Sequence, residues 1–476
     1  MLALFALISP SFASPIAAPG TIGAPDSGPA TPDPAAVHYN PAAMGGSKGV
    51  DGMFDLQLSQ IEVTHTSTRH DGIDPNTGEK YEPSQAKVLV PVGLVGVTWK
   101  PFKWGAIGFA ATDSFVGGGD YSGQEAAWQK EHDDGDEPKY RASTRYAGIK
   151  TQIITVALMP AIAITPIEGF HAGGGFSYVL DKVSLTKASD PLGSEGKGFG
   201  DGEENAYVND VILSAEGSGA HTAWNAGIFV DRWKLFQVGA SYSSAGVIDV
   251  AGDANVHAPD FIAEGSGPVD IKGKFAFSMP LAPVIRVGAA SQINDKLKVG
   301  ATVEYYMWKD CCGGSDGDAK IGLTSKDGDP IGAEDGLALE VDDTIYAPRR
   351  LWNSLVIGAN GGYWVTEGLW VGGRLGYKQY AVPDYAVSAT NIDFDAYGVC
   401  VSARYRFAKK YTVGLAYTKN FLTTRTIKHS GWDVRDPEDS DYVDERFTTV
   451  APYTASGNGT YAANNNVFGL RLGVDL

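Results

Sequence analysis

Side chains alternate with a period of two in segment after segment from Gly52 to the C-terminus, and this pattern constrains the fold more than any other feature. In residues 396–407 the odd positions carry mostly large apolar side chains, whereas the even positions carry alanine, glycine, cysteine, serine and two arginines. Residues 297–308 and 468–476 repeat the pattern. Because successive side chains of a β-strand point to opposite faces, each segment predicts a strand with one apolar face and one small or charged face.

About fourteen such segments are present, and the connections between them predict how they are joined. They lie near residues 52–65, 87–100, 103–113, 147–165, 169–185, 222–231, 235–249, 270–292, 296–308, 352–365, 368–380, 394–408, 410–423 and 464–476. Short turns alternate strictly with long polar loops, which predicts an up-and-down antiparallel barrel with both termini at the short-turn end. Residues 270–292 contain Pro280 and Pro283, and we expect one bulged strand there because a split would break the alternation.

The composition agrees with a barrel that spans a membrane. The chain has 60 glycines and 11% aromatic residues, its mean hydropathy is -0.13, and no apolar run is long enough for a spanning helix. Lipid-facing and lumen-facing residues alternate in a membrane barrel, so their hydropathies cancel in any average. The formal net charge of -18 argues against binding to nucleic acid. Aromatic residues near the short turns predict a girdle at the membrane interface, formed by Trp99, Trp104, Trp233, Trp364, Trp370, Phe407 and Tyr411.

The N-terminal residues predict export followed by a plug. Residues 1–13 read as a signal peptide that is cleaved before Ser14, although the usual basic start is missing. Residues 14–50 are rich in proline, glycine and alanine without periodicity, which suits a hatch packed in the lumen of a barrel formed by residues 51–476.

The adjacent cysteines Cys311 and Cys312 could form a disulfide in an oxidising compartment or remain two thiols. They lack the spacing of zinc ligands. We therefore expect neither a metal site nor a cofactor.

Three stretches resemble the FadL-type outer-membrane transporters of long-chain fatty acids and other hydrophobic molecules. They are the Asn40-Pro41-Ala42 segment, residues 279–308 with a proline-bearing strand and a terminal tryptophan, and residues 351–418. The resemblance implies an all-β fold, an antiparallel transmembrane β-barrel of fourteen strands with an N-terminal hatch, in the outer membrane of a Gram-negative bacterium with both termini in the periplasm. It also implies a monomeric channel for passive uptake, not an enzyme. Its partners would be a long-chain fatty acid or other hydrophobic ligand, outer-membrane lipid and lipopolysaccharide.

The chain departs from the family pattern at two places. Residues 391–395 read Asn-Ile-Asp-Phe-Asp where the family usually has Pro-Asp-x-Asp-Arg, which predicts the loss of a loop contact. The last residue is Leu476 rather than the phenylalanine common in outer-membrane barrels.

The resemblance implies a lateral gap beside a kinked third strand, through which a captured molecule leaves sideways into the bilayer. Here that strand is residues 104–113, and Gly105 and Gly108 make it poor in side-chain bulk. We expect Asn40, Pro41 and Ala42 to lie against it, with Asn40 hydrogen-bonding to unpaired backbone. The alternative is a strand that pairs continuously, with the hatch motif serving only as a rigid turn.

Apolar runs in two predicted loops suggest a surface that captures the ligand. The loops of residues 114–141 and 186–221 match, by position, the family loops that form the first hydrophobic groove. Exposed apolar patches of this kind often mark binding sites. The alternative is that the two loops pack on each other as a lid. The candidate groove residues are Phe115, Val116, Trp128, Tyr207, Val211, Ile212 and Leu213.

The alternation places five basic side chains in the lumen, namely Arg374, Lys378, Arg404, Arg406 and Arg471. One interpretation is a cationic patch that guides a fatty carboxylate. The other is that these side chains pair with Asp26, Asp33 or Asp475 and hold the hatch. Because the lumens of barrels are commonly charged whatever they carry, the second interpretation is favoured.

Two other functions are open to such a chain. An outer-membrane enzyme acting on lipids or esters would need a serine beside a histidine and an acid. His171 faces the lumen by the alternation, whereas His65, His221 and His429 are predicted at or beyond the strand ends, and no such grouping is evident. A general porin would need an open lumen, and a hatch would block it.

Overall fold

The computed structural model describes residues 26–73, 80–122, 142–189, 210–233, 235–259, 267–314, 317–332, 344–347, 349–431 and 457–476. The predicted signal peptide, residues 1–13, lies outside the described residues. No described helix combines the length and the apolar character needed to cross a membrane.

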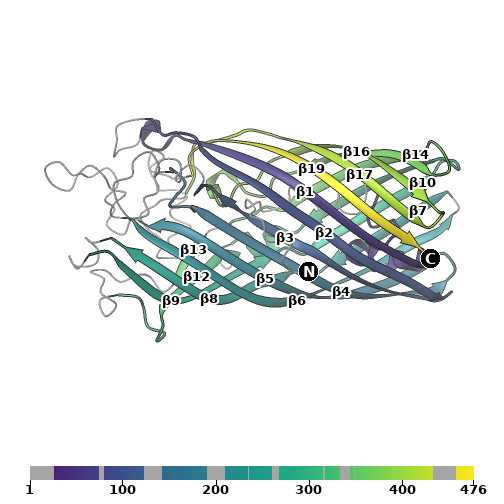
Figure 1. Cartoon of the computed structure of the whole chain (residues 1–476), viewed down its shortest axis with the longest axis horizontal. Coiled ribbons are helices and arrows are strands. Elements are labelled where there is room, and N and C mark those ends of the chain that lie inside the picture. The colour runs from purple at the N-terminus through teal and green to yellow at the C-terminus, as the bar shows by residue number, and fades with distance from the viewer. Residues whose placement is uncertain are drawn as a thin grey trace.

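The described residues form one closed antiparallel barrel (Figure 1). Strands that follow each other in the chain pair around the sheet, and β1 (Gly49–Ser67) pairs with β19 (Gly459–Asp475), which closes the wall. The other wall strands that run as single pieces are β2 (Ser84–Phe102), β3 (Gly105–Asp120), β4 (Lys150–Ile167), β5 (Phe170–Ser189), β6 (Val211–Trp233), β15 (Leu369–Lys378) and β16 (Ala396–Phe407).

The remaining wall positions are each filled by two shorter strands in line. These are β7 (Phe236–Ser243) with β8 (Gly246–Ala258), β9 (Val269–Leu281) with β10 (Val284–Gln292), β11 (Leu297–Tyr306) with β12 (Ala319–Ser325), β13 (Thr344–Ala347) with β14 (Ser354–Trp364), and β17 (Tyr411–Leu422) with β18 (Arg425–Ile427). Counted by position, the described wall has fourteen strands, which confirms the predicted barrel. The strand predicted over residues 270–292 is β9 and β10, interrupted at Ala282 and Pro283.

Three short helical segments and one disulfide complete the connections that the structure describes outside the hatch. The segments are η4 (Arg69–Gly72), α3 (Trp308–Cys312) between β11 and β12, and η8 (Asp384–Ala386). The disulfide joins Cys311 to Cys312, the two residues whose redox state the sequence left open.

Short turns lie at one end of the barrel, beside the C-terminus, and long connections lie at the other end (Figure 1). At this long-loop end several strands run on past their predicted limits. β3 continues to Asp120 and pairs with β4 throughout, while β5 and β6 pair up to Ser189 and Val211. Phe115, Val116 and residues 211–213 therefore lie on strands, and their predicted position in loops is wrong.

Burial follows the predicted alternation. On β16 the side chains of Tyr397, Val401 and Tyr405 are exposed on the outer face, whereas Cys400 between them is buried. An apolar outer face of this kind suits lipid, since no water is available there to solvate polar groups.

Two members of the predicted aromatic girdle lie on the other face. Trp370 is buried in the lumen, with its ring centroid 3.8 Å from Cζ of Arg404. Trp364 lies on the lumen side of the rim, where Cζ of Arg406 is 5.2 Å from its ring centroid. Both side chains stack under arginines, so their place in the girdle was wrongly predicted, whereas Trp99, Trp104 and Trp233 are exposed outside.

Residues 26–47 pack inside the barrel, and we call them the hatch. They contain α1 (Ala36–Tyr39) and the 3-10 helix η3 (Pro41–Gly46), and all four residues of α1 are buried. Pro41 begins η3, where its missing N–H is not needed, and the Asn40 side chain accepts a hydrogen bond from the N–H of Ala42 at 3.2 Å. The hatch contacts β2 to β6, and its acidic side chains reach β16 and β19, so it crosses the lumen.

Two interruptions of the backbone pairing in the wall bear on the site. Pairing between β2 and β3 ends at Leu94 and Thr112, so residues 84–93 of β2 pair only with β1 and residues 115–120 of β3 pair only with β4. We call this loss of pairing the β2–β3 split.

The second place lies between β6 and its next neighbour. Pairing of β6 with β7 ends at Asn225 and Ser243, and pairing with β8 resumes only at Gly219 and Val250. We call this shorter interruption the β6–β8 break.

Candidate ligand-binding site

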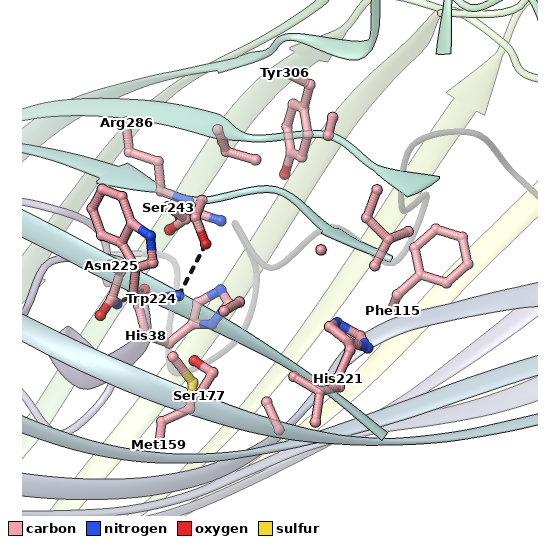
Figure 2. Close-up of a pocket in the computed structure, with 18 of the residues that line it drawn as sticks. His38, Phe115, Met159, Ser177, His221, Trp224, Asn225, Ser243, Arg286 and Tyr306 are labelled. Atoms are coloured by element: carbon pink, nitrogen blue, oxygen red, sulfur yellow. Dashed lines mark hydrogen bonds between the residues drawn. The ribbon is translucent and has the colours of Figure 1, made fainter. Parts of the chain in front are cut away.

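A cavity of about 130 Å³ lies inside the barrel next to α1 of the hatch. Its lining comes from α1, from strands β3 to β11 and from α3, so residues far apart in the chain surround one space (Figure 2). The labelled lining residues are His38, Phe115, Met159, Ser177, His221, Trp224, Asn225, Ser243, Arg286 and Tyr306.

The charged groups on one side of the cavity are paired. Nε of Arg286 donates to Oε2 of Glu304 at 3.2 Å, and its Nη1 donates to Oγ of Ser243 at 2.7 Å. The Tyr306 hydroxyl donates to the same Glu304 oxygen at 3.2 Å. Arg286 and Glu304 are both buried, and together they carry no net charge. A buried pair of this kind leaves no cation over for an anionic ligand.

His221 occupies the opposite side of the cavity, at the β6–β8 break. Its Nδ1 lies 2.7 Å from Oδ2 of the buried Asp181, and its ring lies against Gly246, where an added Cβ would come within 2.7 Å of Nε2. The ring therefore fills the place where backbone pairing is missing. The prediction that His221 lies at or beyond a strand end is wrong, because β6 begins ten residues earlier, at Val211.

His38 is the one hatch residue in the cavity lining. Its side chain comes from α1, where Asn225 holds the backbone by donating from Nδ2 to the carbonyl oxygens of Val37 and His38 at 3.0 and 3.2 Å. Neither ring nitrogen of His38 has a hydrogen-bond partner among the described residues, although the residue is only 8% exposed. Burial, assisted by the charge of Arg286, lowers the pKa of His38 to about 3, so the ring is uncharged at neutral pH.

The apolar part of the lining leads to the β2–β3 split. Phe115 lines the cavity and is the first residue of β3 to pair with β4 after a register shift beyond Asp113. Below this shift β3 is paired on both sides, and above it only on the side of β4. The cavity and the split therefore share the Phe115 side chain.

Side chains replace backbone bonds at the lower end of the split. The Asp113 carboxylate accepts a hydrogen bond from the N–H of Gly93 at 2.8 Å, and the Thr112 hydroxyl donates to the Gly93 carbonyl at 2.9 Å. Both backbone groups of Gly93 that face β3 thus have partners. The split ends at a defined point because these bonds stop the strands from separating further down.

The wall is continuous at the predicted gate glycines. Gly105 and Gly108 pair with Phe102 and Thr98 of β2 and with β4 on their other side, so the lateral gap expected beside them is absent. The pairing with β2 does shift its register between Trp99 and Phe102. A Cβ on Gly108 would lie 2.4 Å from Sδ of Met44 in the hatch. Glycine is needed here because the hatch approaches the strand closely, not because the strand bends.

Asn40 and Ala42 contact β6 and β5, and the helix η3 that begins at Pro41 also contacts β3. Nδ2 of Asn40 donates to the carbonyl oxygens of Pro29 and Ile228 at 2.8 and 2.9 Å, the latter on β6. A Cβ on Gly173 of β5 would come within 2.5 Å of the Ala42 nitrogen. The motif fixes the hatch to β5 and β6.

Three of the five basic side chains predicted in the lumen lie near the short-turn end and form ion pairs. Arg404 pairs with Asp26 of the hatch at 3.0 Å, Arg471 with Asp33 of the hatch at 3.3 Å, and Arg406 with Asp475 at 3.8 Å. This geometry supports the interpretation in which basic side chains hold the hatch.

The other two basic side chains lie higher in the barrel. Lys378 forms an ion pair with the buried Asp393, and Nη2 of Arg374 donates to the Thr302 hydroxyl at 2.7 Å. Asp393 also accepts a hydrogen bond from the N–H of Ala381 at 3.0 Å. The segment that departs from the family pattern thus contacts its surroundings through Asp393.

The described members of the predicted groove are packed rather than exposed. Val211 and Leu213 belong with Phe115 to the largest apolar core, and Ile212 packs in a smaller cluster with Tyr146. Val116 is partly buried against the same core as Phe115. The predicted groove residues Trp128 and Tyr207 lie outside the described residues.

Two features of the site were not anticipated. Asp113 stands at a position where the alternation of β3 calls for an apolar side chain, and this break in the pattern could have located the split. His38 carries no such signal, because its place at the cavity depends on how the hatch docks against β6. Nothing local in the sequence specifies that docking.

The family described as outer membrane protein transport protein (OMPP1/FadL/TodX) has a pattern that matches residues 135–470 of this chain. No curated protein matches the chain at a significant level.

Several solved structures resemble this barrel. A FadL homologue of Pseudomonas aeruginosa is 15% identical, with 94% of each chain covered and a TM-score of 0.68. The toluene transporter TodX of P. putida is 14% identical, with 93% of this chain and 94% of that chain covered and a TM-score of 0.62. The toluene transporter TbuX of Ralstonia pickettii is 14% identical, with 94% of this chain and 96% of that chain covered and a TM-score of 0.57. At such low identity these likenesses show a shared fold.

Proposed function

Because the chain belongs to the OMPP1/FadL/TodX family of outer membrane transport proteins, we propose that it is a passive channel whose hydrophobic ligand leaves sideways through the barrel wall. Long-chain fatty acids and aromatic hydrocarbons are both candidate ligands. The short-turn end and both termini face the periplasm in this proposal, the long-loop end faces lipopolysaccharide, and the protein acts as a monomer.

The observation that carries the proposal is the β2–β3 split. Residues 86–92 of β2 and residues 115–120 of β3 form no strand pairing with each other on the side where they face. Unpaired backbone groups are costly in lipid, so a long unpaired stretch in a barrel wall needs a reason. A split at a fixed place, ended by Asp113, suits an opening for a molecule that moves from the lumen into the bilayer.

The path within the barrel follows from the cavity. A molecule in the cavity contacts Phe115, the side chain at the edge of the split. The hatch closes the way toward the short-turn end, because it packs against β2 to β6 and is ion-paired to β16 and β19. For an apolar molecule, the step into lipid also avoids the cost of entering water.

The enzyme alternative receives no support from the histidines of the barrel. His221 and His171 each contact an aspartate, Asp181 at 2.7 Å and Asp231 at 3.1 Å. Within the described part of the chain no serine hydroxyl hydrogen-bonds to either ring, and Nδ1 of His171 instead contacts the Thr165 hydroxyl at 2.8 Å. A serine hydrolase would need that contact.

Closing the β2–β3 split tests the proposal. Cysteines are introduced at Val90 and Gly117, on the two sides of the split, in a protein whose three native cysteines are replaced by serine. A short bismaleimide then joins them. We expect cells carrying the cross-linked protein to take up radiolabelled oleate or toluene at less than roughly one tenth of the rate of the unlinked protein, because the only proposed exit is closed.

The β6–β8 break provides a matched control. Cysteines at Ala220 and Asp249 stand on the two sides of that break, and cross-linking them should leave uptake unchanged. Undiminished uptake through a sealed β2–β3 split would contradict the lateral route and favour passage beyond the hatch.

A further inference from the structure

The cavity beside the hatch combines a small volume with lining side chains that carry unpartnered buried polar atoms. These are Nδ1 and Nε2 of His38, Oδ1 of Asn225 and Nε1 of Trp308. The volume of about 130 Å³ compares with that of an apolar cavity of about 150 Å³ that is known to hold benzene. A molecule of the size of one ring fits, whereas an extended long acyl chain would leave most of its length outside.

The charges around the cavity disfavour an anion. Arg286 is neutralised by Glu304, and His221 is in contact with Asp181. His38 is uncharged at neutral pH. A carboxylate that entered this space would lose its water without gaining an unpaired cation among the described lining residues, which is costly.

His38 is the lining residue with two ring nitrogens that lack hydrogen-bond partners. A neutral imidazole has one ring nitrogen that donates and one that accepts, and in His38 neither is used although the residue is 8% exposed. Buried polar groups are nearly always hydrogen-bonded, so an exception beside a cavity points to a ligand. A hydroxyl group can both donate and accept, so it satisfies either tautomer.

We infer that the cavity binds an uncharged, ring-sized hydrophobic molecule with a single hydroxyl group, such as a simple phenol, and that His38 hydrogen-bonds to the hydroxyl. The apolar body of the ligand contacts Phe115, Met159 and Val284. This inference rests on the proposed function, since it names the class of molecule that the channel carries. It makes the hatch a part of the binding site as well as a plug.

Three probes that share a methylated benzene ring test the inference by equilibrium dialysis against the purified full chain in detergent. They are 4-methylphenol, toluene and 4-methylbenzoate. We expect the phenol to bind roughly fivefold more tightly than toluene, because one net hydrogen bond supports a preference of that size. The benzoate should bind most weakly. Equal binding of phenol and toluene, or tightest binding of the benzoate, would overturn the inference.

Variants of His38 then assign the preference to this residue. His38→Leu should abolish the preference for the phenol and leave toluene binding intact, whereas His38→Gln, which keeps a donor and an acceptor, should retain most of it. His257→Leu is the matched control, because His257 does not line the cavity and contacts Asp270 near the long-loop end. A preference that survives in His38→Leu would overturn the role of His38.

The same experiment separates this inference from the proposed function. If toluene and the phenol bind equally and both are taken up, the channel function stands and the hydroxyl selectivity fails. If none of the probes binds and uptake is absent, both fail. Heat-dependent migration of the barrel in gels shows that each variant is folded.

Discussion

Arg404 is the residue most involved in holding the hatch. Its guanidinium pairs with Asp26 at 3.0 Å and lies over the Trp370 ring. The side chains of Arg404 and Asp26 are 19% and 13% exposed, so little water is available to replace either partner. We expect Arg404→Gln to lower the free energy of unfolding by about 1–3 kcal/mol, as measured by urea unfolding in lipid vesicles.

Arg406 offers a control on the same strand. It pairs with Asp475 at 3.8 Å, and the two side chains are 42% and 51% exposed. Exposed pairs contribute about 0–1 kcal/mol, so Arg406→Gln should have little effect. Equal destabilisation by both substitutions would show that Arg404 has no special part in holding the hatch.

Asp26 should make the hatch sensitive to acid. Burial by itself raises the pKa of Asp26, but the charges of Arg404, Lys298 and Arg471 outweigh burial and hold the pKa below its ordinary value of 3.8. A folded-state pKa that is lowered stabilises the fold above the unfolded value, and this contribution is lost as the pH falls through the folded-state pKa. We expect Asp26→Asn to lose stability less steeply than the natural chain below pH 3.8, measured by the same unfolding experiment. Identical acid profiles would contradict this.

Pairing of β3 changes along its length at Asp113. The Asp113 carboxylate accepts a hydrogen bond from the N–H of Gly93 at the point where β2 and β3 separate. Asp113→Ala would leave that buried donor without a partner, at a cost of about 1–3 kcal/mol. We expect faster amide hydrogen exchange at Gly93 and its neighbours in β2.

Asp113→Asn retains an oxygen that can accept the bond, so it should exchange at nearly the natural rate. If Asp113→Ala leaves the exchange at Gly93 unchanged, the side chain does not set the end of the split.

The strand number and the two faces of the wall could be predicted from sequence because they depend on a local pattern. Tyr397 and Val401 face outward on β16 as their odd positions require. Strand ends were less predictable, because an apolar run beyond the bilayer can belong either to the continuation of a strand or to a loop that binds a ligand. Residues 211–213 are such a case, since they pair with β5 and pack in the core.

The hatch contacts and the cavity could not be predicted, because they join residues far apart in the chain. Asn40 bonds to Ile228 and Asp33 pairs with Arg471, contacts that depend on how the whole barrel closes. Trp370 was predicted in the girdle because a tryptophan near a turn is usually interfacial. Its partner on the neighbouring strand, however, is Arg404, whose side chain faces the lumen. Stacking on that arginine favoured the lumen side.

For the whole molecule, a hatch packed across the lumen predicts low ionic conductance. Residues 26–47 contact one side of the wall and are ion-paired to the other. We expect small or undetectable ion currents through the full chain in planar bilayers. Deletion of residues 26–47 should give a large, steady conductance, because a barrel of this size is wide enough for an aqueous channel. Large currents through the full chain would instead indicate a general porin.

The ion pairs of the hatch also restrict the order in which the protein can assemble. Asp26 and Asp33 leave the ribosome early, whereas Arg404 and Arg471 are among the last side chains to be made, and Arg471 stands on the strand that seals the barrel against β1. The ion pairs of the hatch are therefore complete only when the final strand arrives. Sealing the wall and completing the ion pairs of the hatch are one event, because both need β19.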